Sequence, residues 1–277
     1  MHTRDPVDRI ILMALEEDGR DITSEAIFRV PQTLSAVVRA KAEGVVAGIE
    51  VARRTFLLVD PGIVFDAACK DGDRVSRGSI VAKVRGPALG VLKAERVALN
   101  FLQRMSGIAT LTSEYVRRVE GTRAKILDTR KTAPGMRILD KAAVRCGGGC
   151  NHRMGLFDMA LVKDNHVDAA GSIEEAVHRV RDAFPGVPVE VEARTLEDVG
   201  LLLKLGVDRI MLDNFSLQDT KRAVALVSGR VPLEASGNIT LDRVREVAET
   251  GVDFISVGEI THSVRALDIA MTIEVSS

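Results

Sequence analysis

A regular alternation of short apolar segments and amphipathic segments fills the chain from about residue 122 onward. Four positions at the ends of the apolar segments, Glu192, Asp213, Ser236 and Gly258, follow one another at intervals of 21, 23 and 22 residues. Strand–helix units of this length build parallel β/α barrels. The spacing therefore predicts a TIM-like α/β barrel. A doubly wound open sheet is the alternative, although no GxGxxG stands at a first strand–helix turn to favour it.

The barrel strands are expected at six segments, namely 124–130, 158–165, 187–193, 208–214, 231–238 and 253–259. The helical segments between them begin after Ser, Thr or a similar residue, whose side chain can accept hydrogen bonds from the first turn. In such barrels the carboxyl ends of the strands converge on one mouth, where the active site lies. The residues that follow these strands are therefore the candidates for function.

Residues 1 to about 107 have a different pattern, with short β-leaning pieces separated by turn residues such as PG and DGD. Residues 6–19 have the apolar spacing of a helix that ends at a glycine, and a long helix is expected around 88–120 with Gly107 as a candidate break. We expect an N-terminal α/β sandwich domain over 1–107 and the barrel over 108–277. A C-terminal helix over 265–277 is expected to pack back on the first domain.

Composition excludes several classes of protein. The chain has 277 residues, of which 46% are hydrophobic, so it can bury a sizeable core. A formal net charge of −1 argues against a nucleic-acid binder, whose surface would be broadly basic. The three cysteines fit a reducing compartment, and no apolar run resembles a signal peptide or a membrane span. We therefore expect a soluble cytoplasmic protein with no nucleic-acid or membrane partner.

Positively charged residues gather at the predicted strand ends. Arg130 and Lys131 follow the first strand, Lys163 lies at the end of the second, and His152 and Arg153 stand just before that second strand. Several cations at one mouth are costly unless an anion neutralises them, and the planar fork of arginine suits carboxylate and phosphate. The pattern predicts an anionic substrate.

Two carboxylates, Glu192 and Asp213, end neighbouring strands at the same predicted mouth. Carboxylates beside a polyphosphate are the usual requirement for Mg²⁺, which keeps several waters. The turn at 236–238 has backbone N–H groups that could hold a phosphate. Taken singly, each of these residues could equally be a helix cap, an ordinary turn or a solvated side chain. Together they predict a magnesium–phosphate substrate beside the anionic one.

The segment CGGGCNHR, residues 146–153, could hold a metal ion or wrap an anion. Cys-x₃-Cys-x-His lacks the spacing of a zinc ribbon, and no second ligand pair occurs elsewhere in the sequence. Three consecutive glycines make a mobile scaffold for a metal, but they let the backbone approach a ligand closely. We interpret the segment as an anion-binding loop.

Several long motifs are specific enough to resemble one known family. The longest is LDTRKTAPGMRILDKAAVRCGGGCNHRMGLFDMALVKDNHV, residues 127–167. The others are AERVALNFLQRMSGIAT (94–110), VEVEARTLED (189–198), DRIMLDNFS (208–216) and LEASGNITLDRVREVAETGVDFISVGEITHSVRALDI (233–269). In these motifs, and over nearly the whole chain from DITSEAIF onward, the sequence resembles the quinolinate phosphoribosyltransferases, also called nicotinate-nucleotide pyrophosphorylases (carboxylating).

The resemblance implies an N-terminal α/β sandwich, an incomplete barrel of about seven strands, and a homodimer with shared active sites or a larger assembly. The implied reaction transfers phosphoribosyl from 5-phosphoribosyl 1-pyrophosphate to quinolinate with decarboxylation. Its products are nicotinate mononucleotide, pyrophosphate and CO₂, in de novo NAD synthesis. Mg²⁺ is the implied cofactor.

Matched position by position, the family motifs also imply roles for individual residues. The residues implied to bind quinolinate are Thr129, Arg130, His152, Arg153, Lys163 and, reaching into the pocket of the partner subunit, Arg96. The residues implied to bind phosphoribosyl pyrophosphate are Lys131, Glu192, Asp213, Ser236, Gly237, Asn238, Gly258 and Glu259. Lys131, Glu192 and Asp213 would be catalytic, with Glu192 and Asp213 holding Mg²⁺ directly or through water.

Three positions depart from the family pattern, and their roles stay open. Relatives commonly have an aliphatic residue at Cys150, an acidic residue or Asn at Arg194, and Ala at Glu259. A same-fold paralogue, such as the molybdenum-locus protein, and a nicotinate phosphoribosyltransferase remain enzyme alternatives, although the intact DTRKT, GGG-x-NHR and KDNH sets favour quinolinate. A non-catalytic barrel that binds phosphorylated metabolites is the alternative from another class.

Overall fold

The structure, a computed structural model, describes residues 5–274. These residues fall into two compact units. The first comprises 5–113, 132–148 and 263–274, and the second comprises 114–131 and 149–262. The chain thus passes between the units several times. Within the described residues, no helix combines the length and the apolar character needed to cross a membrane.

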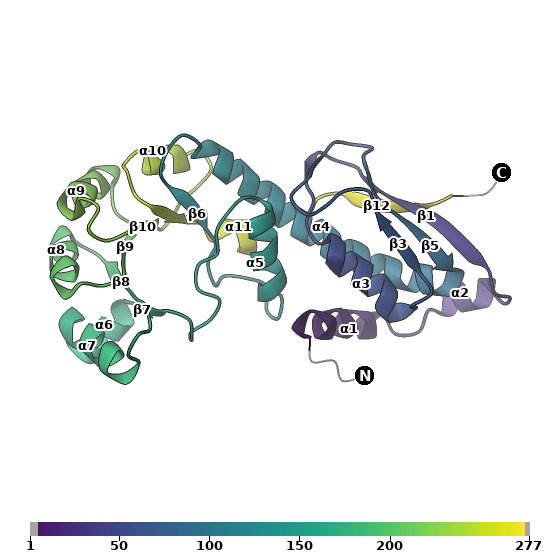
Figure 1. The fold of residues 1–277 in the computed structure, drawn as a ribbon, viewed down its shortest axis with the longest axis horizontal. Coiled ribbons are helices and arrows are strands. Elements are labelled where there is room, and N and C mark those ends of the chain that lie inside the picture. The colour runs from purple at the N-terminus through teal and green to yellow at the C-terminus, as the bar shows by residue number, and fades with distance from the viewer. Residues whose placement is uncertain (1–4, 275–277) are drawn as a thin grey trace. The chain divides into compact units, whose positions relative to one another are not determined.

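The first unit is a two-layer α/β sandwich, as predicted. Its antiparallel sheet has four strands in the order β12-β1-β5-β3, and helices α3 and α4 lie against the sheet (Figure 1). Side chains from the sheet and both helices, such as Val38, Phe56, Val84 and Leu102, are buried in one apolar core. The elements of this unit are α1 (Pro6–Asp18), α2 (Ile22–Ile27), β1 (Thr33–Ala40), β2 (Gly44–Val45), α3 (Ile49–Val59), β3 (Val64–Ala67), β4 (Arg74–Val75), β5 (Ile80–Pro87), α4 (Ala88–Arg118, of which residues 114–118 belong to the second unit), α5 (Arg137–Cys146) and β12 (Ile269–Ile273).

The C-terminal segment forms a strand, so the predicted helix over 265–277 is wrong for the described part of that range. β12 pairs antiparallel with β1, with Ile269 opposite Ala40 and Ile273 opposite Ala36. Residues 275–277 lie outside the described residues. A segment this short has little intrinsic helical stability, and the unpaired edge of β1 offers it a full ladder of hydrogen bonds. The segment packs on the first unit, but through strand pairing.

Helix α4 runs through Gly107 without a break. A Cβ atom at this position would lie 2.3 Å from the carbonyl oxygen of Arg265 and 3.0 Å from Cα of Ala266. One turn earlier, the carbonyl of Gln103 accepts a hydrogen bond from the N–H of Leu267 at 3.0 Å. Gly107 therefore lets the segment before β12 pass directly against the helix backbone, and it does not end the helix.

The second unit is an incomplete parallel barrel. Its six strands follow the order β6-β11-β10-β9-β8-β7, and helices α7, α8 and α9 lie along the outer side of the curved sheet (Figure 1). A parallel bridge between Leu127 and Cys150 adds a seventh, one-residue position beside β6. The elements of this unit are β6 (Lys125–Leu127), β7 (Ala160–Val162), α6 (Asp164–Ala170), α7 (Ile173–Ala183), β8 (Val189–Ala193), α8 (Leu196–Leu205), β9 (Arg209–Asp213), α9 (Leu217–Val227), β10 (Leu233–Ser236), α10 (Val244–Ala248), β11 (Phe254–Ser256) and α11 (Glu259–His262).

The predicted helix caps are confirmed in three of the barrel helices. The side chains of Ser172, Thr195 and Ser216 accept backbone hydrogen bonds at the starts of α7, α8 and α9. Each cap satisfies an N–H group that has no partner within its own helix. The caps fix the points at which the chain leaves the strand ends and turns into the outer helices.

The close contact at Gly107 predicts a pair of opposite effects. Gly107→Ala should lower the free energy of unfolding by roughly 1–3 kcal/mol, because the new methyl group overlaps the backbone at Arg265. Gly200→Ala, within α8 and with open space around the added Cβ, should raise it by roughly 0.5–1 kcal/mol. Urea unfolding of both variants measures this. Equal stabilisation by both substitutions would show that the backbone contact at Gly107 does not form.

Candidate functional site

The carboxyl ends of the parallel strands bring most of the predicted site residues to one side of the barrel. Ser236 on β10 is paired with Asp213 on β9, and Glu192 on β8 is paired with Met211 of β9. Because all neighbouring strands are parallel, residues that follow the strands lie at the same edge. The predicted residues that end or follow a strand there are Thr129, Arg130, Lys131, Lys163, Glu192, Asp213, Ser236, Gly237, Asn238, Gly258 and Glu259.

Lys163 and Glu192 connect two neighbouring strand ends. The ammonium group of Lys163 donates to Glu192 Oε1 in an ion pair, and the glutamate side chain is only 12% exposed. Beside them, Arg194 Nη2 lies 3.1 Å from Asp164 Oδ2, which gives Arg194 an ionic partner at the rim. A substrate carboxylate that binds Lys163 must therefore compete with Glu192.

The side chain of Lys131 lies beside the backbone of Gly258. A Cβ atom at Gly258 would lie 3.2 Å from Cδ of Lys131 and 3.1 Å from the ring of His262. The main chain of Lys131 is fixed on both sides: its N–H donates to Thr129 Oγ1 at 3.0 Å, and its carbonyl accepts from Thr261 Oγ1 at 2.8 Å. The sequence did not predict His262 as a site residue. Its ring lies near Gly258 and Lys131 only because of the turn that the backbone makes between residues 258 and 262.

Two amide side chains form a hydrogen-bonded chain that ends at Asp213. Asn214 Nδ2 donates to Asp213 Oδ1 at 3.0 Å, and Asn238 Nδ2 donates to Asn214 Oδ1 at 3.1 Å. Asn214, Gly237 and Asn238 all have left-handed backbones, with φ of 54°, 100° and 51°. A Cβ at Gly237 would lie 2.2 Å from Asn214 Oδ1, so glycine is required there. Such unusual backbone is typical of sites that hold ligands.

A buried polar cluster lies inside the barrel, on the strands that carry these ends. His152 Nε2 lies 2.9 Å from Glu190 Oε2 and 3.5 Å from Glu234 Oε2. Arg209 Nη1 lies 3.0 Å from Glu234 Oε2, and its guanidinium stacks 4.3 Å from the ring centroid of Phe254. His152, predicted as a quinolinate contact, thus has its ring inside the barrel.

Burial raises the pKa of both glutamates in this cluster. The pKa of Glu190 rises to about 7 against the opposing effect of Arg209. The pKa of Glu234 also rises to about 7, and the neighbouring carboxylate of Glu190 adds to the effect of burial. Two carboxylates that share a buried space ionise with difficulty together. The pair therefore keeps a proton at a pH where an exposed glutamate would have lost it.

His152, Glu190 and Glu234 are also the one group of three possible metal ligands found among residues 5–274 whose ligand atoms lie within 4.8 Å of one another. Arg209 already places a cation at Glu234. The cluster therefore contains one protein cation beside two glutamates, and it is more deeply buried than the strand-end carboxylates Glu192 and Asp213.

The three positions that depart from the family pattern have structural partners. The hydroxyl of the buried Tyr115 donates to Glu259 Oε2 at 2.5 Å, and burial together with this carboxylate raises the pKa of Tyr115. The N–H of Cys150 donates to the carbonyl of Ile126 at 2.8 Å, as in a strand. Arg194 is the residue paired with Asp164 at the rim. The side chain of Glu259 is thus used within the fold.

Cys146, one of the two cysteines that flank the triple glycine, is poorly suited to bind a metal. Burial raises the pKa of Cys146 to about 11, although Arg145 opposes the shift. The thiolate, which is the metal-binding form, is therefore scarce at neutral pH.

Arg96, predicted to act in the pocket of the partner subunit, is an exposed residue of α4 in the first unit.

Fold and site together define a barrel protein that combines cations and carboxylates at one set of strand ends, as anion-binding enzymes do. The family model "Quinolinate phosphoribosyl transferase, N-terminal domain" matches residues 21–106, and its C-terminal counterpart matches residues 108–272. The chain belongs to the quinolinate phosphoribosyltransferase family.

Individual relatives cover almost the whole chain. It is 44% identical to the probable nicotinate-nucleotide pyrophosphorylase (carboxylating) of Bacillus subtilis, over 95% of this chain and 91% of the relative. It is also 44% identical to quinolinate phosphoribosyltransferase (decarboxylating) 2, mitochondrial, of Nicotiana glauca, over 99% of this chain and 84% of the relative. The crystal structure of NadC from Streptococcus pyogenes superposes with a TM-score of 0.93 at 40% identity, with 98% of both chains covered.

The raised pKa values predict a pH-dependent stability. Between about pH 4.5 and about 7 the folded protein holds more protons on Glu190 and Glu234 than the unfolded chain does, so their contribution to stability falls as the pH rises through this window. Glu234→Gln should flatten the fall by on the order of 1–3 kcal/mol. Urea unfolding across this pH range measures the slope, with the exposed Glu246→Gln as the control. Parallel curves for wild type and Glu234→Gln would contradict the prediction.

Proposed function

We propose that this chain transfers phosphoribosyl from 5-phosphoribosyl 1-pyrophosphate to the ring nitrogen of quinolinate. The products would be nicotinate mononucleotide, pyrophosphate and CO₂, a step of NAD synthesis. The main support is the combination of four cations and two carboxylates around the strand ends, namely Arg130, Lys131, Arg153, Lys163, Glu192 and Asp213. A dicarboxylate and a pyrophosphate together carry the negative charge that such a group of cations requires.

Quinolinate is assigned to Arg130, Arg153 and Lys163. The two arginines suit its carboxylates because each guanidinium donates two parallel hydrogen bonds. Thr129 lies beside them and already orients the backbone of Lys131. A substrate held through both carboxylates presents its ring nitrogen in one direction, so proximity supplies much of the acceleration.

Phosphoribosyl pyrophosphate is assigned to the other strand ends. Lys131 would stabilise the negative charge on the departing pyrophosphate, which takes the electron pair of the broken bond. Backbone N–H groups would hold the 5-phosphate at Ser236, Gly237, Asn238, Gly258 and Glu259. The quinolinate nitrogen then bonds to ribose C1. The bond from C2 to its carboxylate breaks and CO₂ leaves, and the electron pair that stays at C2, stabilised by the adjacent positively charged ring nitrogen, takes a proton from water. We propose no covalent enzyme intermediate.

Glu192 and Asp213 fit a Mg²⁺ ion that arrives with the phosphates. They supply carboxylate oxygens at the ends of neighbouring strands, outside the buried three-ligand group. Mg²⁺ commonly takes one or two carboxylates and completes its shell with phosphate oxygens and water. The bound ion would neutralise charge on the pyrophosphate.

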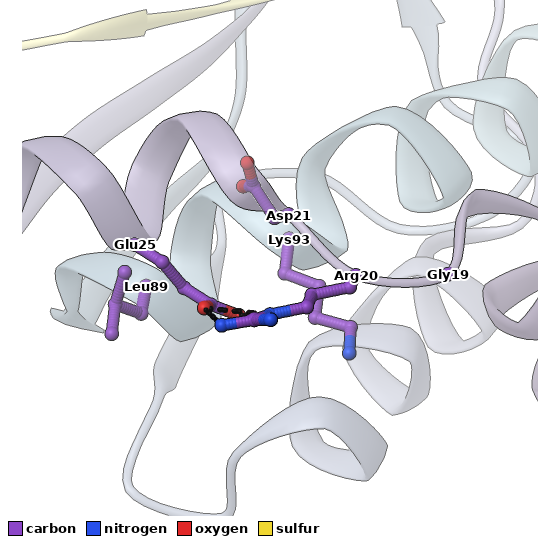
Figure 2. A pocket seen from close by; sticks show the side chains of 6 residues that line it. All are labelled: Gly19, Arg20, Asp21, Glu25, Leu89 and Lys93. Carbon is purple, nitrogen blue, oxygen red and sulfur yellow. Dashed lines mark hydrogen bonds and ion pairs between the residues drawn. The ribbon is translucent and has the colours of Figure 1, made fainter.

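We also propose a homodimer, or a ring built from it, in which Arg96 completes the quinolinate pocket of the partner subunit. The first unit exposes several apolar side chains on α1, α2 and α4, namely Met13, Ile22, Ile27 and Leu89. Figure 2 shows Leu89 beside Lys93, at a pocket of about 380 Å³ where Arg20 pairs with Glu25. These exposed apolar side chains support a protein partner in this proposal. Lys93 and Arg96, three residues apart on α4, would present their cations to it together.

The compartment follows less directly from the residues. We propose a cytoplasmic location, since three free cysteines suit a reducing environment. The relative from Nicotiana glauca is named as mitochondrial.

The reaction is tested by incubating the protein with phosphoribosyl pyrophosphate and either quinolinate or nicotinate, with and without Mg²⁺. Nicotinate mononucleotide and CO₂ should form from quinolinate only, and only with Mg²⁺. Arg130→Ala should raise the KM for quinolinate by roughly 10- to 100-fold, the loss expected for one charge-assisted pair, without unfolding the protein. Turnover of nicotinate, or of neither acid by folded protein, would contradict the assignment.

The shared site is tested by co-expressing two inactive variants, Arg96→Ala and Lys131→Ala. Half of randomly formed dimers are mixed, and each mixed dimer has one intact site, so about a quarter of wild-type activity should return. Lys131→Ala co-expressed with Glu192→Gln is the control, because no combination of these two restores a complete site. A mixture as inactive as the control would rule out a contribution of Arg96 across the dimer.

A further inference from the structure

The one tyrosine of the chain, Tyr115, lies in the interior of the second unit. It belongs to the end of α4 that this unit includes, and none of its surface is exposed. Its hydroxyl donates a hydrogen bond to Glu259 Oε2 at 2.5 Å and lies 3.5 Å from the carbonyl oxygen of Ile239. A buried phenol thus reaches two loops that are distant in the sequence.

These two loops follow neighbouring barrel strands. β10 and β11 run parallel, with Ala235 opposite Ile255. Ile239 comes directly after the turn at 236–238, and Glu259 comes directly after Gly258. Both loops are assigned to the 5-phosphate in the proposed function. The hydroxyl of Tyr115 therefore contacts both sides of the proposed phosphate site.

An acidic side chain beside this site is unfavourable for a phosphate. A phosphate monoester carries about two negative charges at neutral pH, and like charges close together at a protein surface repel more strongly than they do in water. Glu259 is the residue after Gly258, and it is half-buried. The direction of its carboxylate therefore decides whether a phosphate at these loops meets a repelling charge.

The hydrogen bond from Tyr115 fixes that direction. A hydroxyl that donates to a carboxylate forms a short, charge-assisted hydrogen bond, which is stronger than one between neutral groups. Burial, and then the carboxylate of Glu259, raise the pKa of Tyr115, so the phenol keeps its proton and stays a donor. Because Tyr115 is fully buried, the carboxylate that it holds is directed into the protein.

We propose that Tyr115 is a positioning residue for the 5-phosphate: its hydroxyl holds the carboxylate of Glu259 away from the loops at 236–238 and 258, whose backbone N–H groups then bind a phosphate dianion. The proposal rests on the proposed function for the place of the phosphate. It gives the side chain of Glu259, whose role the sequence left open, a fixed orientation.

A double-mutant cycle in the full-length protein tests this role. Binding of ribose 5-phosphate is measured by calorimetry for wild type, Tyr115→Phe, Glu259→Gln and the double variant. Tyr115→Phe keeps the ring and removes only the hydroxyl. We expect it to weaken binding roughly tenfold beside the charged Glu259, and less than about twofold when residue 259 is the neutral Gln, because no charge is then left to restrain.

Two outcomes of this cycle would overturn the proposal. Equal losses in both backgrounds would show that the hydroxyl supports the fold or the phosphate directly, whatever the charge at residue 259. Full affinity in Tyr115→Phe would show that the carboxylate needs no restraint. The KM for phosphoribosyl pyrophosphate should follow the same cycle as the affinity for ribose 5-phosphate.

A second ligand and a matched variant control for general distortion. Quinolinate is assigned to other strand ends, so its affinity should stay the same in Tyr115→Phe, and a parallel loss of both ligands would count against positioning. Thr250→Val removes another buried hydroxyl of the second unit, which donates to the carbonyl of Val247 at 2.6 Å. It should leave the affinity for ribose 5-phosphate unchanged.

Salt provides a readout that a purely structural role would not move. The affinity ratio between wild type and Tyr115→Phe should shrink as the ionic strength rises from about 0.1 M to about 1 M, because the Debye length falls from about 10 Å to about 3 Å. A ratio that is independent of salt would overturn the proposal. Wild-type protein that shows the expected cycle but makes no product from quinolinate would instead contradict the proposed function alone.

Discussion

Carboxylates buried inside the barrel constrain everything built on its strand ends. Asp128, Glu190 and Glu234 are fully buried, and a buried carboxylate is costly unless donors or cations surround it. Asp128 accepts from the loop residues Asn151 and His152, and Glu234 accepts from Arg209 on the strand between the two glutamates, whereas the oxygens of Glu190 accept no hydrogen bond from residues 5–274. The hydrogen bonds to Asp128 therefore fix the loop that carries Arg153. The polar groups inside the barrel therefore help to set the geometry of the residues at its mouth.

The mouth itself holds charge that the protein alone balances only in part. The Lys163–Glu192 ion pair neutralises one cation, whereas burial, and then the nearby charge of Arg130, lower the pKa of Arg153. Holding cations together before the ligand arrives avoids rearrangement when it binds, which is the physical basis of electrostatic preorganisation. The arrangement is costly for the free protein and favourable once a multiply charged anion enters.

Glycines decide how closely these parts approach. Gly237 leaves room for the amide of Asn214, and Gly258 leaves room for Lys131 and the ring of His262. In the first unit, Gly107 does the same for the segment that leads into β12. A methyl group would overlap atoms of another segment at Gly107 and Gly237 and would make a tight contact at Gly258, so the requirement is for space, and at Gly237 for a left-handed backbone as well.

Sequence by itself determined the barrel, its six strand segments, the capped helices and the residues at the strand ends, because periodicity, caps and strand-end chemistry are local properties. It also determined the family, since long ordered motifs are specific. Only the tertiary structure decided that residues 269–273 form a strand, that α4 continues through Gly107, that His262 lies beside Lys131, and that His152 turns inward to Glu190. Each of these depends on a partner far away in the chain. Local pattern cannot determine an edge strand, a close backbone contact or the direction of a side chain, because packing against distant residues sets them.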